Sequence, residues 1–135
     1  MTISVLIADD QQLVRAGFRM LVESQDDLGV VGEAGDGREA VEQARRLRPD
    51  VVLMDVRMPR LNGVAATAEL TAAGELPRVL VLTTFDADEY VFAALKAGAS
   101  AFLLKDAPPE QLLGAIRDVH RGDAVVAPSA TRRLL

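Results

Sequence analysis

Short runs of apolar residues alternate with amphipathic stretches along most of the chain. Each run is four to seven residues long, which is too short for a stable helix, and the richest in Val, Ile and Leu are typical of buried β-strands. The run at residues 28–34 is the weakest of the set because it contains two glycines. The predicted strands cover residues 3–8, 28–34, 51–54, 79–83 and 101–104.

The segments between these runs have helical length and helical spacing of apolar residues. Asp36 is a candidate N-cap, and Gly98 and Gly122 are candidate helix ends. In the first helix, one apolar stripe is formed by Leu13, Ala16, Gly17, Met20 and Leu21. The predicted helices cover residues 12–23, 36–48, 64–73, 88–97 and 108–122.

Strands that are apolar throughout and separated by helices favour a parallel sheet covered on both faces. Right-handed crossovers make a doubly wound α/β fold, with a five-stranded parallel sheet and five helices, the leading topology. In such sheets ligands bind beyond the carboxyl ends of the strands. Functional side chains are therefore expected at the carboxyl ends of the predicted strands.

Chain length, net charge and the counts of Cys and His exclude several kinds of binding and catalytic site. At 135 residues the chain has the length of one domain, and its net charge of −5 argues against a broad basic face for nucleic acid. The absence of Cys excludes disulfides, thiolate nucleophiles and Cys-ligated metals, and a single His excludes most zinc sites. We find no apolar run long enough for a membrane span and no secretory signal pattern, so we expect a cytoplasmic location without membrane partners.

Polar residues follow four of the predicted strands. Asp9 and Asp10 follow the first, Asp55 the third, Thr83 ends the fourth, and Lys105 follows the fifth. Any one of them alone is more simply a turn residue, a helix cap or a surface charge. Together they would place three carboxylates at one edge, where mutual repulsion costs free energy unless a cation such as Mg²⁺ relieves it.

This set of groups suggests phosphoryl transfer to a carboxylate. With no Cys and no His near a strand end, the available nucleophile is an Asp. Phosphoryl transfer needs an in-line nucleophile and neutralisation of charge on the phosphoryl oxygens. Mg²⁺ held by Asp9 and Asp10, together with the Lys105 ammonium, would supply that neutralisation, and the Thr83 hydroxyl could bind a phosphoryl oxygen on Asp55.

The chain contains the motifs Asp9-Asp10, MDVRMP (54–59) with Gly63, LTTFD (82–86) and AGASAFLLKD (97–106). These four separated motifs resemble the receiver (REC) domain of bacterial two-component response regulators. The amino-acid sequences of these motifs are similar to those of the NarL/FixJ (LuxR-type) subclass, and the resemblance extends from about Ile3 to Gly122. It implies a flavodoxin-like, CheY-like receiver fold and a role in phosphorelay signal transduction and transcription regulation.

The resemblance also implies a role for each matching residue. Asp55 would be the phosphoacceptor, taking its phosphoryl group from a phosphohistidine of a sensor histidine kinase. Asp10, Asp55 and the backbone carbonyl of Arg57 would bind Mg²⁺ directly, and Asp9 through water. Thr83 and Lys105 would contact the phosphoryl group. Slow hydrolysis would return the chain to its resting state, so that it is a self-phosphorylating switch and not a conventional enzyme.

The same resemblance makes Phe102 a switch aromatic that rotates inward when Thr83 moves toward the phosphoryl group. Without it, a Phe in a short strand is a core residue. The surface that would change lies on the last two helices and the last strand, and we expect Tyr90 and Val91 on its exposed or partly exposed side. Bulk at Arg57 and Phe85 would hinder the attacking water, which predicts a phosphorylated state lasting minutes or longer.

The thirteen residues after Gly122 are too few for a helix-turn-helix domain. We interpret residues 1–122 as the receiver domain and 123–135 as the start of a linker to a C-terminal DNA-binding domain that this sequence lacks. DNA would then bind only to the parent protein, and a homodimer is a further candidate assembly.

Two other functions remain open from the residues alone. A pseudo-receiver would keep the fold and act only through protein contacts, but the intact acids, Thr83 and Lys105 disfavour it. A flavodoxin-like nucleotide binder shares the topology, but its phosphate would meet the acidic, glycine-free turn after the first strand. Arg60, where a small residue is frequent in the family, could alter kinase contacts.

Overall fold

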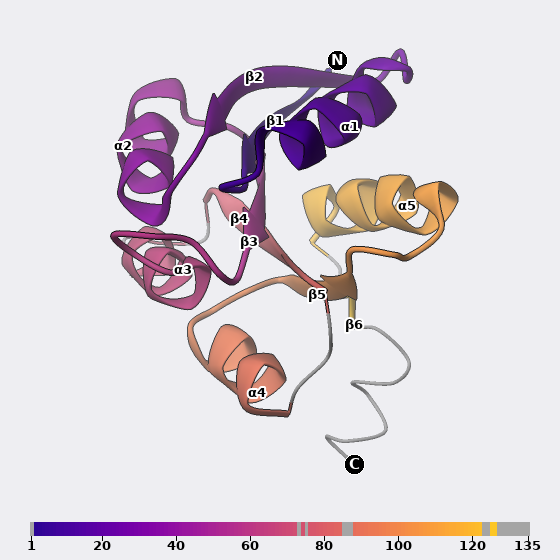
Figure 1. The fold of residues 1–135 in the computed structure, drawn as a ribbon. Helices are drawn as coiled ribbons and strands as arrows, with labels where there is room; N and C mark the ends of the chain where they lie inside the picture. Colours follow the sequence, from indigo (N-terminus) through magenta and orange to yellow (C-terminus); the bar gives the residue numbers. More distant parts are fainter. Residues whose placement is uncertain (1, 73, 75, 85–87, 123–124, 127–135) are drawn as a thin grey trace.

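A parallel β-sheet with helices on both faces forms the molecule (Figure 1). The computed structural model describes residues 2–72, 74, 76–84, 88–122 and 125–126. Helices α1 and α5 cover one face of the sheet, and α2, α3 and α4 cover the other. The helices are α1 (Gln12–Glu23), α2 (Gly37–Leu47), α3 (Gly63–Thr71), α4 (Asp88–Lys96) and α5 (Pro109–His120).

The strand order is β2-β1-β3-β4-β5-β6, and all the pairs are parallel. This order confirms the doubly wound fold with five main strands. The third strand is one residue longer than the predicted strand at 51–54, because Asp55 also pairs with β4. The strands are β1 (Ile3–Ala8), β2 (Leu28–Ala34), β3 (Val51–Asp55), β4 (Arg78–Thr83), β5 (Ala101–Leu104) and β6 (Val125–Val126).

The sixth strand is a difference from the predicted five-stranded sheet. β6 pairs with Ala101 and Phe102 of β5, beyond the boundary expected at Gly122. A two-residue strand gives almost no pattern in the sequence, and only pairing with the open edge of β5 defines it. Residues 123–124 and 127–135 lie outside the described part of the chain, and the linker to a further domain stays a prediction.

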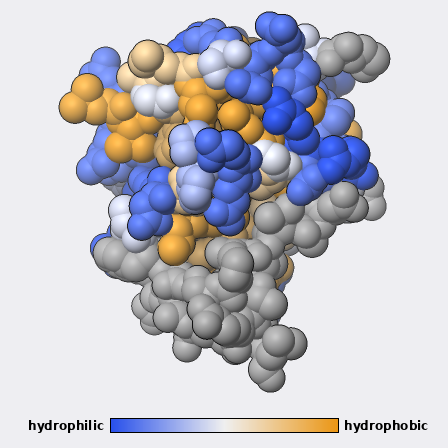
Figure 2. Space-filling view, turned by 90° about the vertical axis from the view of Figure 1, so that its right-hand side faces the viewer, coloured by the Kyte–Doolittle hydropathy of each residue, from blue (hydrophilic) through white to orange (hydrophobic). Residues whose placement is uncertain are grey.

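The apolar stripe predicted for α1 lies only partly on the side that faces the core, because Leu21 packs there but Leu13 and Met20 do not. Leu13 is 88% exposed and Met20 is 75% exposed, whereas Val22 is fully buried and Phe18 and Leu21 pack against the core. Two apolar sets with helical spacing interleave on this helix, and periodicity alone does not say which of them faces the sheet. Apolar residues are therefore visible among hydrophilic ones on the side of the molecule that carries α1 and α5 (Figure 2).

The register of the central strands brings the candidate functional residues to one edge. Ala8 of β1 pairs with Met54 of β3, and Asp55 pairs with Leu82 of β4. Thr83 pairs with Leu104 of β5 in turn. All five residues of β3 are buried, so the sheet centre is fixed by apolar packing on both faces.

The predicted helix ends agree with the structure. Asp36 accepts a hydrogen bond from the backbone N–H of Glu39 at 2.8 Å and caps α2. Gly98 and Gly122 follow α4 and α5 with φ of 101° and 97°, which favours glycine. Among the described residues, none of the helices is both long and apolar enough to cross a membrane.

Candidate functional site

Three carboxylates meet at the carboxyl edge of the sheet. Asp9 and Asp10 follow β1 directly, and Asp55 is the last residue of β3. One carboxylate oxygen of each lies within 4.8 Å of the others. Asp9 and Asp55 are buried, while Asp10 is exposed to solvent at the open side of the cluster. The structure thus brings together the acids that the sequence analysis expected to converge.

Lys105 joins the same cluster from the end of β5. Its Nζ lies 2.6 Å from Asp9 Oδ2 and 3.2 Å from Asp55 Oδ1, and its backbone N–H donates to the Thr83 carbonyl. Burial disfavours the ammonium, but the hydrogen bond to Asp9 and the charge of Asp55 outweigh it and raise the pKa of Lys105. The lysine is therefore a fixed positive charge beside both carboxylates.

Burial is the main reason why the pKa of Asp55 rises to about 6. The neighbouring Asp9 charge raises the pKa further, and Lys105 opposes the shift. A carboxylate with this pKa is mostly ionised at pH 7 but is less stable than an exposed one. A divalent cation or a covalent partner at Asp55 would offset the unfavourable free energy of this buried charge.

Thr83 ends β4 at the same edge and is buried. It lines a cavity of about 280 Å³ that also opens onto the acids and Lys105. The cavity is of a size for a small anion and a hydrated ion beside Asp55. Its lining residues are Asp10, Gln11, Asp55, Arg57, Thr83, Thr84 and Lys105.

Phe102 lies in β5 and is fully buried, so its ring already occupies the core. This position is the one expected of a plain core residue, and its role as a switch stays a prediction. The expectation that Val91 is exposed was wrong: Val91 is fully buried, because α4 packs this residue against the sheet. The side chain of Tyr90 and the whole of Phe85 lie outside the described residues.

The loop from β3 to α3 carries Arg57 and is held by close backbone packing. The Gly63 N–H donates to the Val56 carbonyl at 2.8 Å. A Cβ on Gly63 would lie 1.9 Å from the carbonyl oxygen of Asp55, and one on Gly37 would lie 1.8 Å from that of Leu61. The close packing of Gly37 appears only in the tertiary structure, because Leu61 is distant in the sequence.

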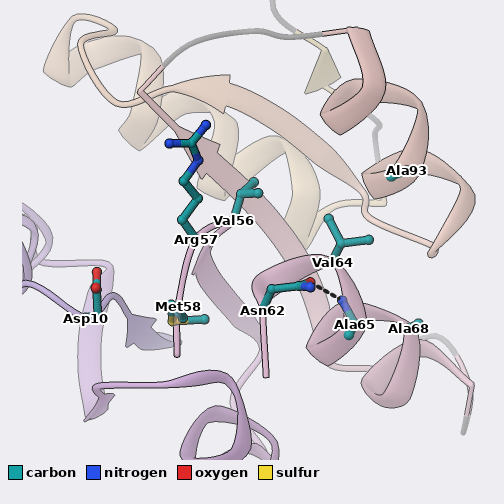
Figure 3. A pocket seen from close by; sticks show the side chains of 9 residues that line it. All are labelled: Asp10, Val56, Arg57, Met58, Asn62, Val64, Ala65, Ala68 and Ala93. Atoms are coloured by element: carbon teal, nitrogen blue, oxygen red, sulfur yellow. Dashed lines mark hydrogen bonds between the residues drawn. The ribbon is translucent and has the colours of Figure 1, made fainter. Parts of the chain in front are cut away.

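A larger cavity of about 880 Å³ lies beside the site, between the β3–α3 loop, α3 and α4. Figure 3 shows its lining, with the Arg57 side chain extending away from Asp10. Most of its wall is apolar, including Val56, Val64 and Ala93. No local sequence pattern marks this cavity, because its wall comes from separate segments of the chain.

The donor set fits a hard divalent cation. All three side-chain ligands are carboxylate oxygens, and such oxygens are the ligands that Mg²⁺ prefers. The exposed position of Asp10 and the adjoining cavity leave space for the water molecules that Mg²⁺ retains. Asp9, Asp10 and Asp55 are thus the described residues that could hold the ion.

The family model of the response regulator receiver domain matches residues 5–117. The chain belongs to this family. Receiver domains bind Mg²⁺ at an acidic pocket and are phosphorylated by sensor kinases, and LuxR-type regulators bind DNA through a C-terminal domain.

Relatives and solved structures support the NarL/FixJ (LuxR-type) subclass. The receiver domain is 49% identical over 123 residues to the transcriptional regulatory protein YxjL of Bacillus subtilis (strain 168), covering 91% of this chain and 56% of that protein. It is 42% identical over 132 residues to the oxygen regulatory protein NreC of Staphylococcus carnosus (strain TM300), covering 97% and 61%. The chain therefore spans less than two thirds of these curated relatives.

Solved structures agree with this assignment. A LuxR-family two-component response regulator from Aurantimonas sp. SI85-9A1 matches with a TM-score of 0.91 at 31% identity, over 98% of this chain and 94% of that chain. The signal receiver domain of the response regulator NarL from Mycobacterium tuberculosis matches with a TM-score of 0.85 at 37% identity, over 90% and 98%. These matches confirm the predicted receiver fold and subclass.

Proposed function

We propose that the receiver domain takes a phosphoryl group onto Asp55 from the phosphohistidine of a sensor histidine kinase. The observation that carries this proposal is the convergence of Asp9, Asp10 and Asp55 with the Lys105 ammonium, beside a small cavity that the last three of these residues line. Folding does not require three carboxylates in contact, and their repulsion is a cost that a cation-dependent function explains.

In the transfer, an Asp55 carboxylate oxygen forms a bond to phosphorus as the phosphorus–nitrogen bond to the donor histidine breaks, and the electron pair leaves with the imidazole. Asp55 must be ionised to attack, and its pKa of about 6 allows this at neutral pH. When bound to Asp9, Asp10, Asp55 and the Arg57 carbonyl, Mg²⁺ would offset charge on the phosphoryl oxygens.

The chain's own residues supply the remaining contacts. Lys105 lies 3.2 Å from Asp55 and can pair with a phosphoryl oxygen by a small movement of its flexible side chain. The Thr83 hydroxyl borders the same cavity and can donate a hydrogen bond to another oxygen. A shift of Thr83 toward the phosphoryl group would alter packing near Phe102 and change the surface formed by α4, β5 and α5.

This surface would control an output domain in the parent protein. We expect a cytoplasmic transcription regulator whose DNA-binding domain follows the linker that begins near residue 123. Phosphorylation would change the assembly of the parent protein, with a homodimer as one form, and thereby its binding to DNA.

The proposal is tested with acetyl phosphate as the phosphodonor. In Mg²⁺, the protein should gain the mass of one phosphoryl group, which hydroxylamine should then remove, as expected for an acyl phosphate. Asp55→Asn should abolish the gain, whereas Asp106→Asn, an exposed acid beside Lys105, should retain it. A folded wild-type protein that gains no phosphate would contradict the proposal and favour a pseudo-receiver.

The lifetime of the phosphorylated state is measured in the same samples. We expect decay over minutes or longer, because the Arg57 side chain borders the cavity beside Asp55 and restricts approach of water. Loss of the phosphate within seconds would contradict this expectation.

A further inference from the structure

Arg15 lies in the first turns of α1, and its side chain reaches back to the acidic turn that precedes the helix. Its Nη1 donates to the backbone carbonyl of Asp9 at 2.5 Å, and its Nε donates to Glu33 Oε1 at 3.1 Å. The Arg15 side chain is only 18% exposed. One guanidinium therefore links the turn after β1 to the end of β2.

Glu33, which accepts a hydrogen bond from Arg15, is itself held in place by further hydrogen bonds. Its other carboxylate oxygen accepts a hydrogen bond from Arg19 Nη1 at 2.7 Å, and its backbone carbonyl accepts one from Gln43 at 2.7 Å. The hydrogen bond from Arg19, helped by the one from Arg15, lowers the pKa of Glu33 despite its partial burial. Glu33 thus stays ionised at neutral pH and holds Arg15 in place.

Every polar group of Asp9 has a partner in this arrangement. Its N–H donates to the Ala34 carbonyl at 3.0 Å, its Oδ1 accepts from the Gln11 N–H at 2.9 Å, and its Oδ2 accepts from Lys105. Arg15 holds the remaining group, the carbonyl. Because the peptide bond is planar, fixing this carbonyl also fixes the N–H of Asp10 and the direction in which Asp10 leaves the turn.

Asp10 depends on this backbone because it is exposed. Its side chain is open to solvent, and one of its carboxylate oxygens lies within 4.8 Å of those of Asp9 and Asp55. We propose that Arg15 is a positioning residue that holds the Asp9–Asp10 peptide so that the Asp10 carboxylate meets a bound Mg²⁺, an inference that rests on the proposed function.

The sign of one measurement separates this role from a simple effect of charge. A guanidinium near a cation site repels the cation, so removal of its charge alone would tighten Mg²⁺ binding. Removal of a positioning contact would weaken it, since loss of a hydrogen bond that orients a ligand typically lowers metal affinity. The two effects have opposite directions, and Arg15 carries both.

Arg19 provides the matched control. It lies on the same helix, carries the same charge and pairs with the same Glu33, and its other partner is the exposed Glu23. Titration calorimetry with MgCl₂ should show a Kd about 3- to 10-fold higher for Arg15→Met. For Arg19→Met it should stay within about 2-fold of wild type, and Arg15→Lys, which can still donate to the Asp9 carbonyl, should recover part of the loss.

A second measurement follows the turn itself. In the metal-free protein, the backbone amide of Asp10 should become more mobile in NMR relaxation for Arg15→Met but not for Arg19→Met. Glu33→Gln retains Arg15 but weakens its anchor, and it should give an intermediate Mg²⁺ Kd. This variant keeps the test decisive if Arg15→Met folds poorly.

The outcomes separate the two proposals. If wild type binds Mg²⁺ and accepts phosphate, but Arg15→Met and Glu33→Gln bind Mg²⁺ as tightly as wild type or more tightly, the positioning role is overturned and the proposed function stands. If Arg15→Met and Arg19→Met weaken binding equally, the effect belongs to Glu33 or to the helix and the positioning role is again overturned. A wild-type protein that binds no Mg²⁺ overturns both.

Discussion

Replacing Asp55 by Asn should stabilise the metal-free receiver domain at neutral pH. The structure raises the pKa of Asp55 to about 6, mainly through burial and then through the Asp9 charge. The native state therefore binds the Asp55 proton more tightly than the unfolded chain does. It follows that the contribution of Asp55 to stability falls as pH rises from about 4 to about 6 and is level above that range.

The size of the effect follows from the pKa shift. A shift of about two pKa units corresponds to roughly 3 kcal/mol at 1.36 kcal/mol per unit. The carboxylate borders a cavity that is open to water, so screening reduces this figure to about 1–2 kcal/mol. Asn has nearly the same shape as Asp without the charge, so Asp55→Asn should gain about that amount at pH 7.

The assay is urea denaturation in the presence of a chelator, followed by far-UV circular dichroism because the chain has no Trp. The two proteins should differ at pH 7 and converge near pH 4. Addition of Mg²⁺ should stabilise wild type more than the variant, which lacks a charged ligand. A variant that is no more stable than wild type at pH 7, or a difference that does not change with pH, would refute the reasoning.

Asp27 provides a control of opposite sign. Hydrogen bonds from Arg117 at 2.8 and 2.9 Å lower the pKa of Asp27. The stability from this pair is present above the ordinary pKa of an Asp and is lost as pH falls through the lowered value. Asp27→Asn should therefore destabilise the protein at pH 7, with a difference that shrinks in acid.

Three further predictions concern packing and charge. Gly63→Ala should lower the free energy of unfolding by about 2–4 kcal/mol, because its Cβ would be forced against the Asp55 carbonyl. Gly114→Ala, which adds a Cβ in open space within α5, should raise the free energy of unfolding by about 0.5–1 kcal/mol. Urea midpoints equal to that of wild type would contradict both. Phe102→Ala should lower the free energy of unfolding by about 3–5 kcal/mol because the ring is fully buried. A loss below about 1 kcal/mol would contradict this and would mean that neighbouring side chains fill the space that the ring leaves. Lys105→Met should raise the pKa of Asp55 above about 6 in carboxyl-detected NMR, because Lys105 lowers it now; an unchanged pKa would count against the Lys105–Asp55 pair.

Much of the fold could be predicted because the local signals agree with the tertiary structure. The run at 51–54 is apolar at every position, which only a strand covered on both faces satisfies, and β3 is buried throughout. Asp36 begins α2 by a local hydrogen bond, and Gly98 ends α4 by its backbone freedom, so that both signals can be read from nearby residues.

The site was predictable for a related reason. In a parallel sheet the carboxyl ends of the strands share one edge, so polar residues at those ends must be neighbours once the strand order is known. Asp9, Asp55 and Lys105 are far apart in the chain but meet through this topology alone. Arg15 is different, because it contacts the Asp9 carbonyl from within a helix. No position at a strand end marks such a residue in the sequence.

The sequence by itself determined the alternation of strands and helices, the capping residues and the identity of the groups at the strand ends, because these depend on residue type and local spacing. Only the tertiary structure decided which side of α1 faces the core, where β6 pairs, how closely Gly37 and Gly63 approach the backbone, and how Glu33 and Arg15 hold the acidic turn. The physical reason is that each of these features depends on a contact between distant segments, whose energy is defined only when both surfaces are in place.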